Sequence, residues 1–275
     1  MVAVKAIDRQ RMRGNFSSHA GEYDLYAQVQ KRVVARLSDS LTLDEVSAGP
    51  ILDIGTGTGA LAQSITNSHA GSNLPGSILL MDIAHGMTCE AHRRLPQALA
   101  CDGDARSLPF SANSFPLVMS SSVYQWVERL DQAFAEVLRI LQPGGRFAVA
   151  LFGEQTLFEL RSSHRQAIAR CGSARPSHVQ SFPSGDEVSQ ALSSAGFRGS
   201  EVASFMEQEY HADVPTLLRN LKHIGASNAS SDQPRGLASR RVMQQMISLY
   251  EQNYRSEHGI TASYQVIIAT AQKKP

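Results

Sequence analysis

The sequence predicts an α/β fold built on a mostly parallel sheet of seven strands, with helical insertions that form a lid. Short apolar runs alternate with segments of helical periodicity, which is typical of parallel strands joined by right-handed helical crossovers. A glycine-rich turn, DIGTGTG at residues 53–59, directly follows the first apolar run. The 275 residues suffice for one α/β domain of about 150 to 200 residues plus insertions.

The apolar pattern places each element along the chain. Strands are expected near residues 50–54, 77–83, 97–101, 115–121, 146–151, 201–211 and 263–273. A helix is expected before the first strand, with a stripe of Leu25, Tyr26, Val29, Val33, Val34 and Leu37. Another precedes the fifth strand, with Ala133, Phe134, Val137, Leu138 and Leu141 on one face. Beyond residue 152 the sequence predicts four more helices, at 158–170, 186–197, 214–225 and 239–254.

Composition and charge favour a compact cytoplasmic enzyme. Apolar residues make up 42% and charged residues 19%, and the formal net charge is +1, so no strong field attracts nucleic acid or a membrane surface. No run reaches the eighteen or so apolar residues of a membrane span, and residues 1–16 lack the apolar core of a signal peptide. Cys89, Cys101 and Cys171 are scattered without the spacing of metal ligands, which indicates reduced thiols and no metal. We expect a monomer.

The glycine-rich turn indicates a nucleotide-type site. Gly55, Gly57 and Gly59 permit a sharp turn close to a ligand, because glycine alone tolerates positive φ freely and has no Cβ. Their alternating spacing differs from G-x-G-x-x-G, and Asp53 would repel a pyrophosphate. A cationic or zwitterionic ligand with a ribose is favoured, and S-adenosylmethionine fits. Asp82 follows the second strand and is placed to accept both ribose hydroxyls, although it could instead cap the next helix.

DIGTGTG resembles the first motif of the class I methyltransferases, [DE]-x-G-x-G-x-G, and three further segments agree with that family in order. GDARSLPF at 103–110 resembles the loop after the third strand, FPLV at 115–118 the fourth strand, and LQPGGRF at 141–147 the turn into the fifth. Pro116 stands where the family usually has Asp, a departure that a strand start tolerates. The resemblance covers residues 50–152 and implies a Rossmann-like sheet that binds S-adenosylmethionine and releases S-adenosylhomocysteine.

The resemblance also implies which residues hold the donor. Asp104 would accept from the adenine amino group, with the neighbouring N–H of Ala105; Asp104 could equally cap a turn with Arg106. The full set of expected donor-site residues is Asp53, Gly55, Gly57, Gly59, Asp82, Ile83, Met87, Asp104, Ala105, Ser121 and Gln125.

Four other segments narrow the resemblance. Residues 15–30, VYQW at 123–126, LLRNLKHIGASN at 217–228 and TASYQVIIATAQK at 261–273 together resemble the malonyl-acyl-carrier-protein O-methyltransferases of biotin synthesis. That family methylates the free carboxylate of a malonyl thioester on acyl-carrier protein, or on coenzyme A. The implied organisation is one domain, 1–275, with a core at about 45–152, 197–211 and 262–273 and a helical lid from 1–24, 153–180 and 213–257.

Groups on the lid are candidates for holding the acceptor. A carboxylate is already ionised at neutral pH, so no general base is required and the reaction depends on alignment and exclusion of water. The candidate catalytic residues are Tyr23, Tyr124, Lys222 and His223. The candidate substrate- or carrier-binding residues are Phe16, Trp126, Arg161, Arg219 and Lys222, and His164, Arg165, Arg240 and Arg241 could extend a basic surface.

Several simpler interpretations compete with these assignments. Lys222 and His223 could belong to a solvated helix face, and Trp126 to the core. The chain could also be another small-molecule methyltransferase, acting on a quinone precursor or a free acid. A third alternative is a methyltransferase-like assembly factor or hydroxylase.

Overall fold

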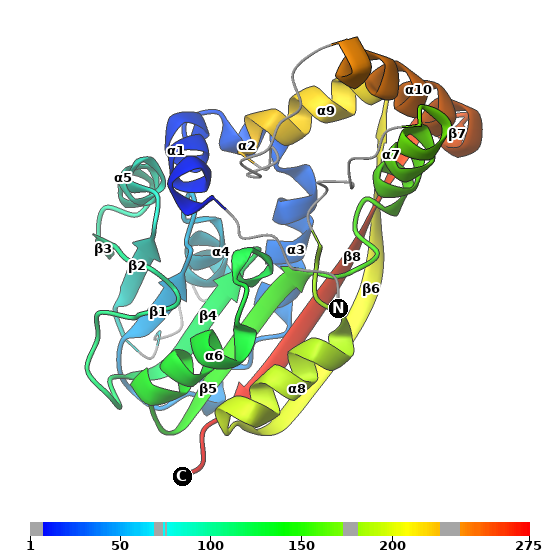
Figure 1. Cartoon of the computed structure of the whole chain (residues 1–275). Helices are drawn as coiled ribbons and strands as arrows, with labels where there is room; N and C mark the ends of the chain where they lie inside the picture. The colour runs from blue at the N-terminus through cyan, green and yellow to red at the C-terminus, as the bar shows by residue number, and fades with distance from the viewer. Residues whose placement is uncertain (1–7, 69–73, 75, 173–180, 226–236) are drawn as a thin grey trace.

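The computed structural model describes residues 8–68, 74, 76–172, 181–225 and 237–275. Within these residues one eight-stranded sheet runs through the molecule in the order β3-β2-β1-β4-β5-β8-β6, with β7 paired to β8 (Figure 1). The strands are β1 (Ile51–Ile54), β2 (Ile78–Asp82), β3 (Leu99–Asp102), β4 (Phe115–Ser121), β5 (Leu141–Phe152), β6 (Arg198–His211), β7 (Arg255–Ser256) and β8 (Gly259–Gln272).

Strand direction follows the prediction of a mostly parallel sheet. β1 pairs in parallel with β2 and β4, β2 with β3, and β4 with β5. β8 runs antiparallel to both β5 and β6. The seven predicted strands are all present, and the short β7 is an addition. Because β1 to β4 point the same way, their carboxyl ends meet at one edge of the sheet.

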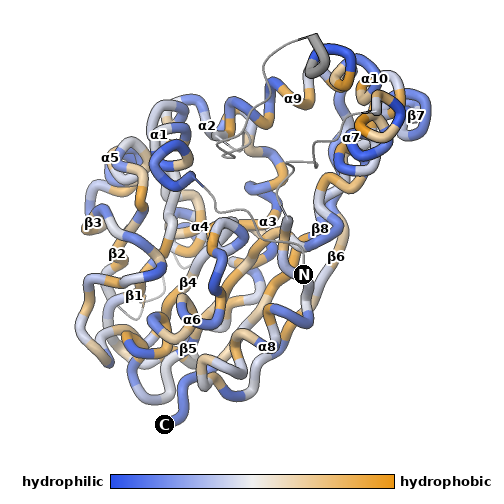
Figure 2. The backbone as a smooth tube through the Cα atoms, in the orientation of Figure 1, coloured by the Kyte–Doolittle hydropathy of each residue, from blue (hydrophilic) through white to orange (hydrophobic). Residues whose placement is uncertain are grey.

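Helices cover both faces of the sheet (Figure 1). One apolar cluster packs α6 (Leu130–Ile140) and α8 (Gly185–Ala195) against one face. A second cluster packs α3 (Gln28–Asp39), α4 (Ala60–Ser68) and α5 (His85–Arg94) against the other. Figure 2 shows hydrophobic residues concentrated along the strands and on the inner sides of the helices. Within the described part of the chain, no helix combines the length and apolar character needed to cross a membrane.

The remaining helices lie beyond the carboxyl ends of the strands. They are α1 (Arg9–His19), α2 (Tyr23–Tyr26), α7 (Phe158–Arg170), α9 (Val214–His223) and α10 (Leu237–Tyr254), with the short 3-10 turn η2 (Tyr124–Trp126) after β4. A second 3-10 turn, η1 (Leu43–Glu45), precedes β1. α7 packs on α10 and β8, and α9 lies between α2 and α10 (Figure 1). Of the predicted lid segments, residues 1–7, 173–180 and 226–236 lie outside the described residues.

Two predicted boundaries are wrong. Leu25 does not belong to the buried stripe: its residue is 70% exposed, because the chain leaves helical geometry at Ala27 and α3 starts afresh at Gln28. The fifth strand begins at Leu141 and not at residue 146. A register shift between Phe115 and Leu117 lets the two strands pair on both sides of the irregularity, and Pro116 stands at the shift, where proline costs little.

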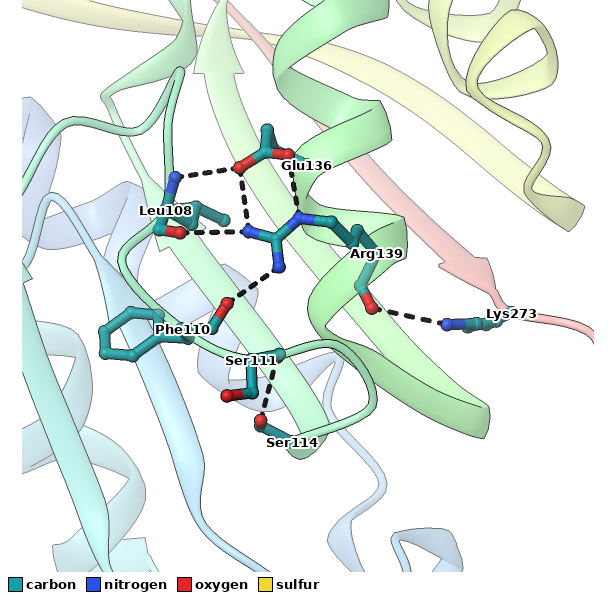
Figure 3. A network of polar contacts seen from close by, with 7 residues as sticks. All are labelled: Leu108, Phe110, Ser111, Ser114, Glu136, Arg139 and Lys273. Carbon is teal, nitrogen blue, oxygen red and sulfur yellow. Dashed lines mark hydrogen bonds and ion pairs between the residues drawn. The ribbon is translucent and has the colours of Figure 1, made fainter.

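A polar network secures the long segment between β3 and β4 (Figure 3). The Arg139 guanidinium on α6 donates to the carbonyl oxygens of Leu108 at 2.9 Å and Phe110 at 2.7 Å. Glu136 accepts from the Leu108 N–H at 2.9 Å and pairs with Arg139 at 2.8 Å. Lys273 Nζ reaches the Arg139 carbonyl from the C-terminal segment. These bonds anchor to α6 the segment that begins at Asp104.

Candidate active site

A cavity lies at the carboxyl ends of β1 to β4. Its floor is formed by residues at the ends of these strands and directly after them: Asp53, Ile54, Gly55, Thr56, Gly57, Thr58, Asp82, Ile83, Gly103, Asp104, Ala105, Arg106, Ser121, Ser122 and Val123. Its cover comes from α1, α2 and α3, through Arg9, Met12, Phe16, Tyr23, Asp24, Ala27, Gln30, Lys31 and Val34. Ala60, Leu61, Met81, Met87, Trp126 and Val127 also line the cavity.

The three glycines of the turn have positive φ values of 64°, 56° and 81°, and each has a different neighbour. A Cβ on Gly55 would lie 2.1 Å from the Val123 side chain, so the turn packs directly on the segment after β4. A Cβ on Gly59 would meet Ala91 of α5 at 3.3 Å, so Gly59 serves helix packing. A Cβ on Gly57 would meet nothing within 4 Å, and Gly57 lines the cavity. Gly57 therefore leaves open the space that a ligand needs.

Asp82 ties the ends of β1 and β2 together. Its two carboxylate oxygens accept from the Gly57 N–H at 3.0 Å and from the Ala84 N–H at 2.8 Å. The residue is 8% exposed, and burial raises its pKa to about 6, despite the opposing effect of these hydrogen bonds. The alternative role as a helix cap is wrong, because α5 is preceded by Ala84 and has no side-chain cap.

Asp53 is the more deeply buried acid. The residue is 1% exposed and accepts from the Thr56 hydroxyl at 2.7 Å. Burial raises its pKa to about 7; the Thr56 hydrogen bond opposes the shift and the charge of Asp82 adds to it. Two desolvated acids facing one cavity form an environment that a cationic group would stabilise.

Asp104 caps a turn with Arg106, as the alternative interpretation of this residue predicted. Its carboxylate accepts from the Arg106 backbone N–H at 3.0 Å and pairs with the Arg106 guanidinium. Burial alone would raise its pKa, but the bonds from Arg106 outweigh burial and lower it. Asp104 also lines the cavity, with Ala105 beside it.

The cover is attached to the floor by polar and aromatic contacts. Asp24 of α2 accepts from the Thr58 hydroxyl at 2.9 Å and pairs with Arg94 of α5. Ser17 of α1 accepts from the Gly86 N–H at 2.9 Å. Phe16 meets Trp126 edge to face, with ring centroids 5.7 Å apart. The N-terminal helices therefore close the cavity from above.

Comparison with known proteins agrees with this geometry. The family model of a methyltransferase domain matches residues 52–149. A malonyl-[acyl-carrier protein] O-methyltransferase from Geobacter sulfurreducens is 41% identical over 270 residues, which cover 97% of this chain and 100% of that protein. The chain belongs to the malonyl-[acyl-carrier protein] O-methyltransferase family. Its predicted fold class and family are thereby confirmed.

One further relative and one solved structure are also similar to this chain. The biotin biosynthesis bifunctional protein BioHC of Cellvibrio japonicus is 33% identical over 263 residues, which cover 95% of this chain and 49% of that protein. A candidate methyltransferase from Bacillus halodurans C-125 has a TM-score of 0.60 and 14% identity, with 88% of this chain and 99% of that chain covered. This second likeness concerns the fold alone.

The structure of this family member brings most predicted donor residues to one cavity. Those that line it are Asp53, Gly55, Gly57, Asp82, Ile83, Met87, Asp104, Ala105 and Ser121, together with Phe16, Tyr23 and Trp126 from the acceptor set. Gly59 and Gln125 do not line it. Gln125 is buried on η2 and donates to the Ser122 carbonyl at 2.8 Å.

Five predicted acceptor residues lie elsewhere. Tyr124 is 0% exposed and packs among Phe134 and Phe147, and burial raises its pKa. His223 stacks on Tyr26, with ring centroids 4.3 Å apart. Lys222 and Arg219 are exposed on α9, and Arg161 of α7 bonds to the Glu154 carbonyl. None of the five lines the cavity: Tyr124 packs into the core, and the other four lie on α7 and α9, which pack beside the cover.

Sequence reasoning missed several lining residues. Met12, Gln30, Lys31 and Ser122 all face the cavity. Gln30 and Lys31 lie on α3, whose apolar stripe predicted the helix but not which polar neighbours meet the site. Met12 is the one buried residue of α1, a helix with little periodic pattern. Ser122 could best have been found from the sequence, because it directly follows a predicted parallel strand and ligands bind at the carboxyl ends of such strands.

Proposed function

We propose that this chain transfers a methyl group from S-adenosylmethionine to the free carboxylate of a malonyl thioester carried by acyl-carrier protein, as a step of biotin synthesis. The proposal depends mainly on the match with the malonyl-[acyl-carrier protein] O-methyltransferase of Geobacter sulfurreducens, which covers nearly the whole of both chains. The name of the bifunctional relative supports the biotin assignment. The cavity at the carboxyl ends of β1 to β4 is the proposed site of reaction.

The proposed donor site fits the chemistry of S-adenosylmethionine. The buried carboxylate of Asp53 suits the ammonium group of the donor's methionine part, and the carboxylate of Asp82 suits its ribose hydroxyls. Asp104 and the Ala105 N–H offer an acceptor and a donor to an adenine edge. When bound, S-adenosylmethionine supplies an electrophilic methyl group on a sulfonium centre. Gly57 leaves the room that this requires.

The protein's part in catalysis is alignment and desolvation. The acceptor carboxylate is ionised at neutral pH, so no side chain needs to remove a proton. Holding two reactants in line can contribute about 7 to 11 kcal/mol. Met12, Phe16 and Trp126 form an apolar cover that excludes water. The pKa of Tyr23 is raised, first by burial and then by Asp24 and Asp82, so its hydroxyl stays protonated and can donate to an anionic acceptor.

The helices α7, α9 and α10 are proposed to receive the acidic carrier. Arg165, Arg219, Lys222, Arg240 and Arg241 are exposed on them. α9 is joined to the cover, since a Cβ on Gly225 would lie 2.9 Å from the Phe16 ring. A carrier bound at this basic face would be close to the cover that admits its substrate.

Transfer of labelled methyl groups tests this function. The chain is incubated with donor labelled in the methyl group and with malonyl carrier protein, malonyl-coenzyme A or free malonate in parallel. We expect label on the malonyl carrier that mild base releases as methanol, as a methyl ester requires. Unacylated carrier is the control. Label that resists base, or label on no malonyl compound, would contradict the proposal.

A further inference from the structure

One basic residue of the cavity wall has no carboxylate partner. Among the described residues, three basic ones line the cavity: Arg9, Lys31 and Arg106. Burial raises the pKa of Asp104, but its bonds from Arg106 and the charge of Arg9 lower it more, so both arginines belong to the Asp104 end of the cavity. Within the described part of the chain, the ammonium of Lys31 makes neither an ion pair nor a hydrogen bond. Lys31 is therefore the one of the three that is free to bind an anionic group elsewhere in the cavity.

Lys31 lies on the face that α3 and its N-cap turn toward the cavity. The residues of that face are spaced three and four apart, as one side of a helix requires: Ala27, Gln30, Lys31 and Val34. Lys31 is exposed and also lines a polar groove that adjoins the cavity. It therefore stands at the boundary between the cavity and solvent, where its flexible four-carbon stem lets the ammonium turn toward an anion on the cavity side.

Asp53 and Lys31 both lie beside the start of α4. The Ala62 N–H, in the first turn of α4, hydrogen-bonds to the Asp53 carboxylate. Ala60, the first residue of α4, lines both the cavity and the groove, as Lys31 does, and α3 packs on α4. β2 separates β1, which carries Asp53, from β3, which precedes Asp104. The buried acid and the exposed cation therefore share one end of the cavity, opposite the end that holds the two arginines.

We propose that Lys31 binds the carboxylate of the donor's methionine part, beside the ammonium group that Asp53 receives. This assignment rests on the proposed function and adds a residue to its donor site. The ammonium and the carboxylate of an amino acid share one carbon atom, so an acid and a cation that bind both must lie near each other. Asp53 and Lys31 provide these two opposite charges at the start of α4.

The malonyl carboxylate is the other anion that a cation at this cavity could bind. Its negative charge is lost as the ester forms, so a cation paired with it would stabilise the substrate more than the transition state. The donor's own carboxylate keeps its charge throughout the reaction, so Lys31 can hold it without this penalty. The chemistry of the reaction therefore agrees with the position of Lys31 beside Asp53.

Two ligands that differ only in the carboxylate test the proposal. They are S-adenosylhomocysteine and S-adenosyl-3-thiopropylamine, which is the same molecule without the carboxylate. Lys31→Met removes the charge and keeps an unbranched side chain. Arg13→Met is the matched control, because Arg13 is an exposed cation on α1 that does not line the cavity. Calorimetry measures the affinity of each protein for both ligands, and for malonyl carrier protein in the presence of S-adenosylhomocysteine. Thermal unfolding measures the melting temperature.

We expect Lys31→Met to bind S-adenosylhomocysteine about tenfold more weakly than the wild type, because a hydrogen bond between charged groups is lost. It should bind S-adenosyl-3-thiopropylamine as tightly as the wild type does, since that ligand has no carboxylate. Arg13→Met should bind both ligands as the wild type does. Lys31→Arg, which keeps the positive charge, should retain the affinity for S-adenosylhomocysteine to within about threefold. All three should melt with the wild type, because exposed substitutions change stability little.

Contrary results are distinct. If Lys31→Met loses the same affinity for both ligands, Lys31 shapes the cavity without binding the carboxylate, and the assignment is wrong. The assignment is also wrong if Lys31→Met binds S-adenosylhomocysteine as tightly as Arg13→Met does; weaker binding of malonyl carrier protein would then give Lys31 to the acceptor. The proposed function stands in both cases. If the wild-type chain neither binds S-adenosylhomocysteine nor methylates malonyl carrier protein, the proposed function fails and this assignment fails with it.

Discussion

The strand-end loops and the C-terminal helices of this molecule both bury carboxylates, but for different purposes. Asp53 and Asp82 are buried at a cavity wall, and burial raises the pKa of each. Glu159 of α7 is equally buried, at 1% exposure, with a raised pKa, yet its carboxylate accepts from the Ser263 N–H at 3.2 Å within the packing of α7 on β8. A buried acid marks a site only where it opens onto space that a ligand can fill.

Positive φ values occur in both regions, but only in the first do they belong to residues of the cavity wall. The loops after β1 and β4 contain three glycines and one serine with positive φ, and Gly55, Gly57 and Ser122 among them line the cavity. Leu157 and Gly172, at the two ends of α7, also have positive φ and do not line it. α7, α9 and α10 are held by regular apolar packing, with Leu217, Met246 and Leu249 buried and basic residues exposed. The loops of the first region line a cavity, whereas the packed helices of the second stabilise the fold and present a charged surface.

Replacing Asp82 should give the largest effect. Asp82→Ala removes the acceptor for the Gly57 and Ala84 N–H groups and the proposed ribose contact. At about 1.5 to 3 kcal/mol for each bond to a charged acceptor, donor affinity should fall by more than about 100-fold. Glu159→Gln is the matched control from the other region, expected to leave donor affinity unchanged. Calorimetry with S-adenosylhomocysteine measures both, and equal losses would erase the distinction between the two buried acids.

Alanine substitutions at two glycines distinguish the loss of space for a ligand from the energetic cost of positive φ. Gly57 and Gly172 have φ values of 56° and 63°, and neither has a neighbour within 4 Å of a Cβ. Alanine at either position should lower the free energy of unfolding by about 1 kcal/mol. Only Gly57→Ala should weaken donor binding, by about tenfold, because Gly172 follows α7 outside the cavity. Thermal unfolding and calorimetry on both variants check this, and a matching loss of affinity in Gly172→Ala would refute it.

The pH dependence of stability should reveal the buried charge of Asp53. Its pKa of about 7 in the folded chain exceeds the value near 3.9 expected after unfolding, so unfolding releases a proton between these values. This contribution favours the folded chain most below pH 4 and is lost as pH rises through 7. An amide side chain does not titrate, so Asp53→Asn should gain stability relative to wild type by about 1 kcal/mol or more from pH 4 to pH 7.

Denaturant unfolding at several pH values measures that difference. Donor affinity of the wild type should move the other way and increase from pH 5 to pH 8, because a cation favours the ionised acid. A difference between variant and wild type that stays constant with pH would show that Asp53 is ionised throughout.

Charge reversal on α9 should give the smallest effect. Arg219→Glu with Lys222→Glu should raise KM for malonyl carrier protein about threefold at low salt, and the effect should shrink as salt screens it. Arg198→Glu is the control, since Arg198 is exposed at the start of β6, at the opposite end of the strand from α9. Steady-state kinetics at two ionic strengths distinguish them. Equal KM values for the two variants would remove α9 from the carrier surface.

The sequence predicted the sheet and the strand-end residues because their signals are local. Apolar runs define strands and glycines define turns. An acid at the end of a parallel strand lies at the carboxyl end of the sheet, whichever strands are its neighbours. Asp53, Gly57 and Asp82 could therefore be named from the sequence alone, and so could the resemblance to the family.

Tertiary structure alone decided which cover residues face the cavity. Lys31, Met12 and Ser122 reach it, whereas Lys222, His223 and Tyr124 do not. Neighbours in one helix or turn point in different directions, and the choice among them depends on how α1, α3 and α9 dock on the sheet. That docking is set by contacts between residues far apart in the chain, such as Phe16 with Trp126 and Asp24 with Arg94, and no local pattern encodes it.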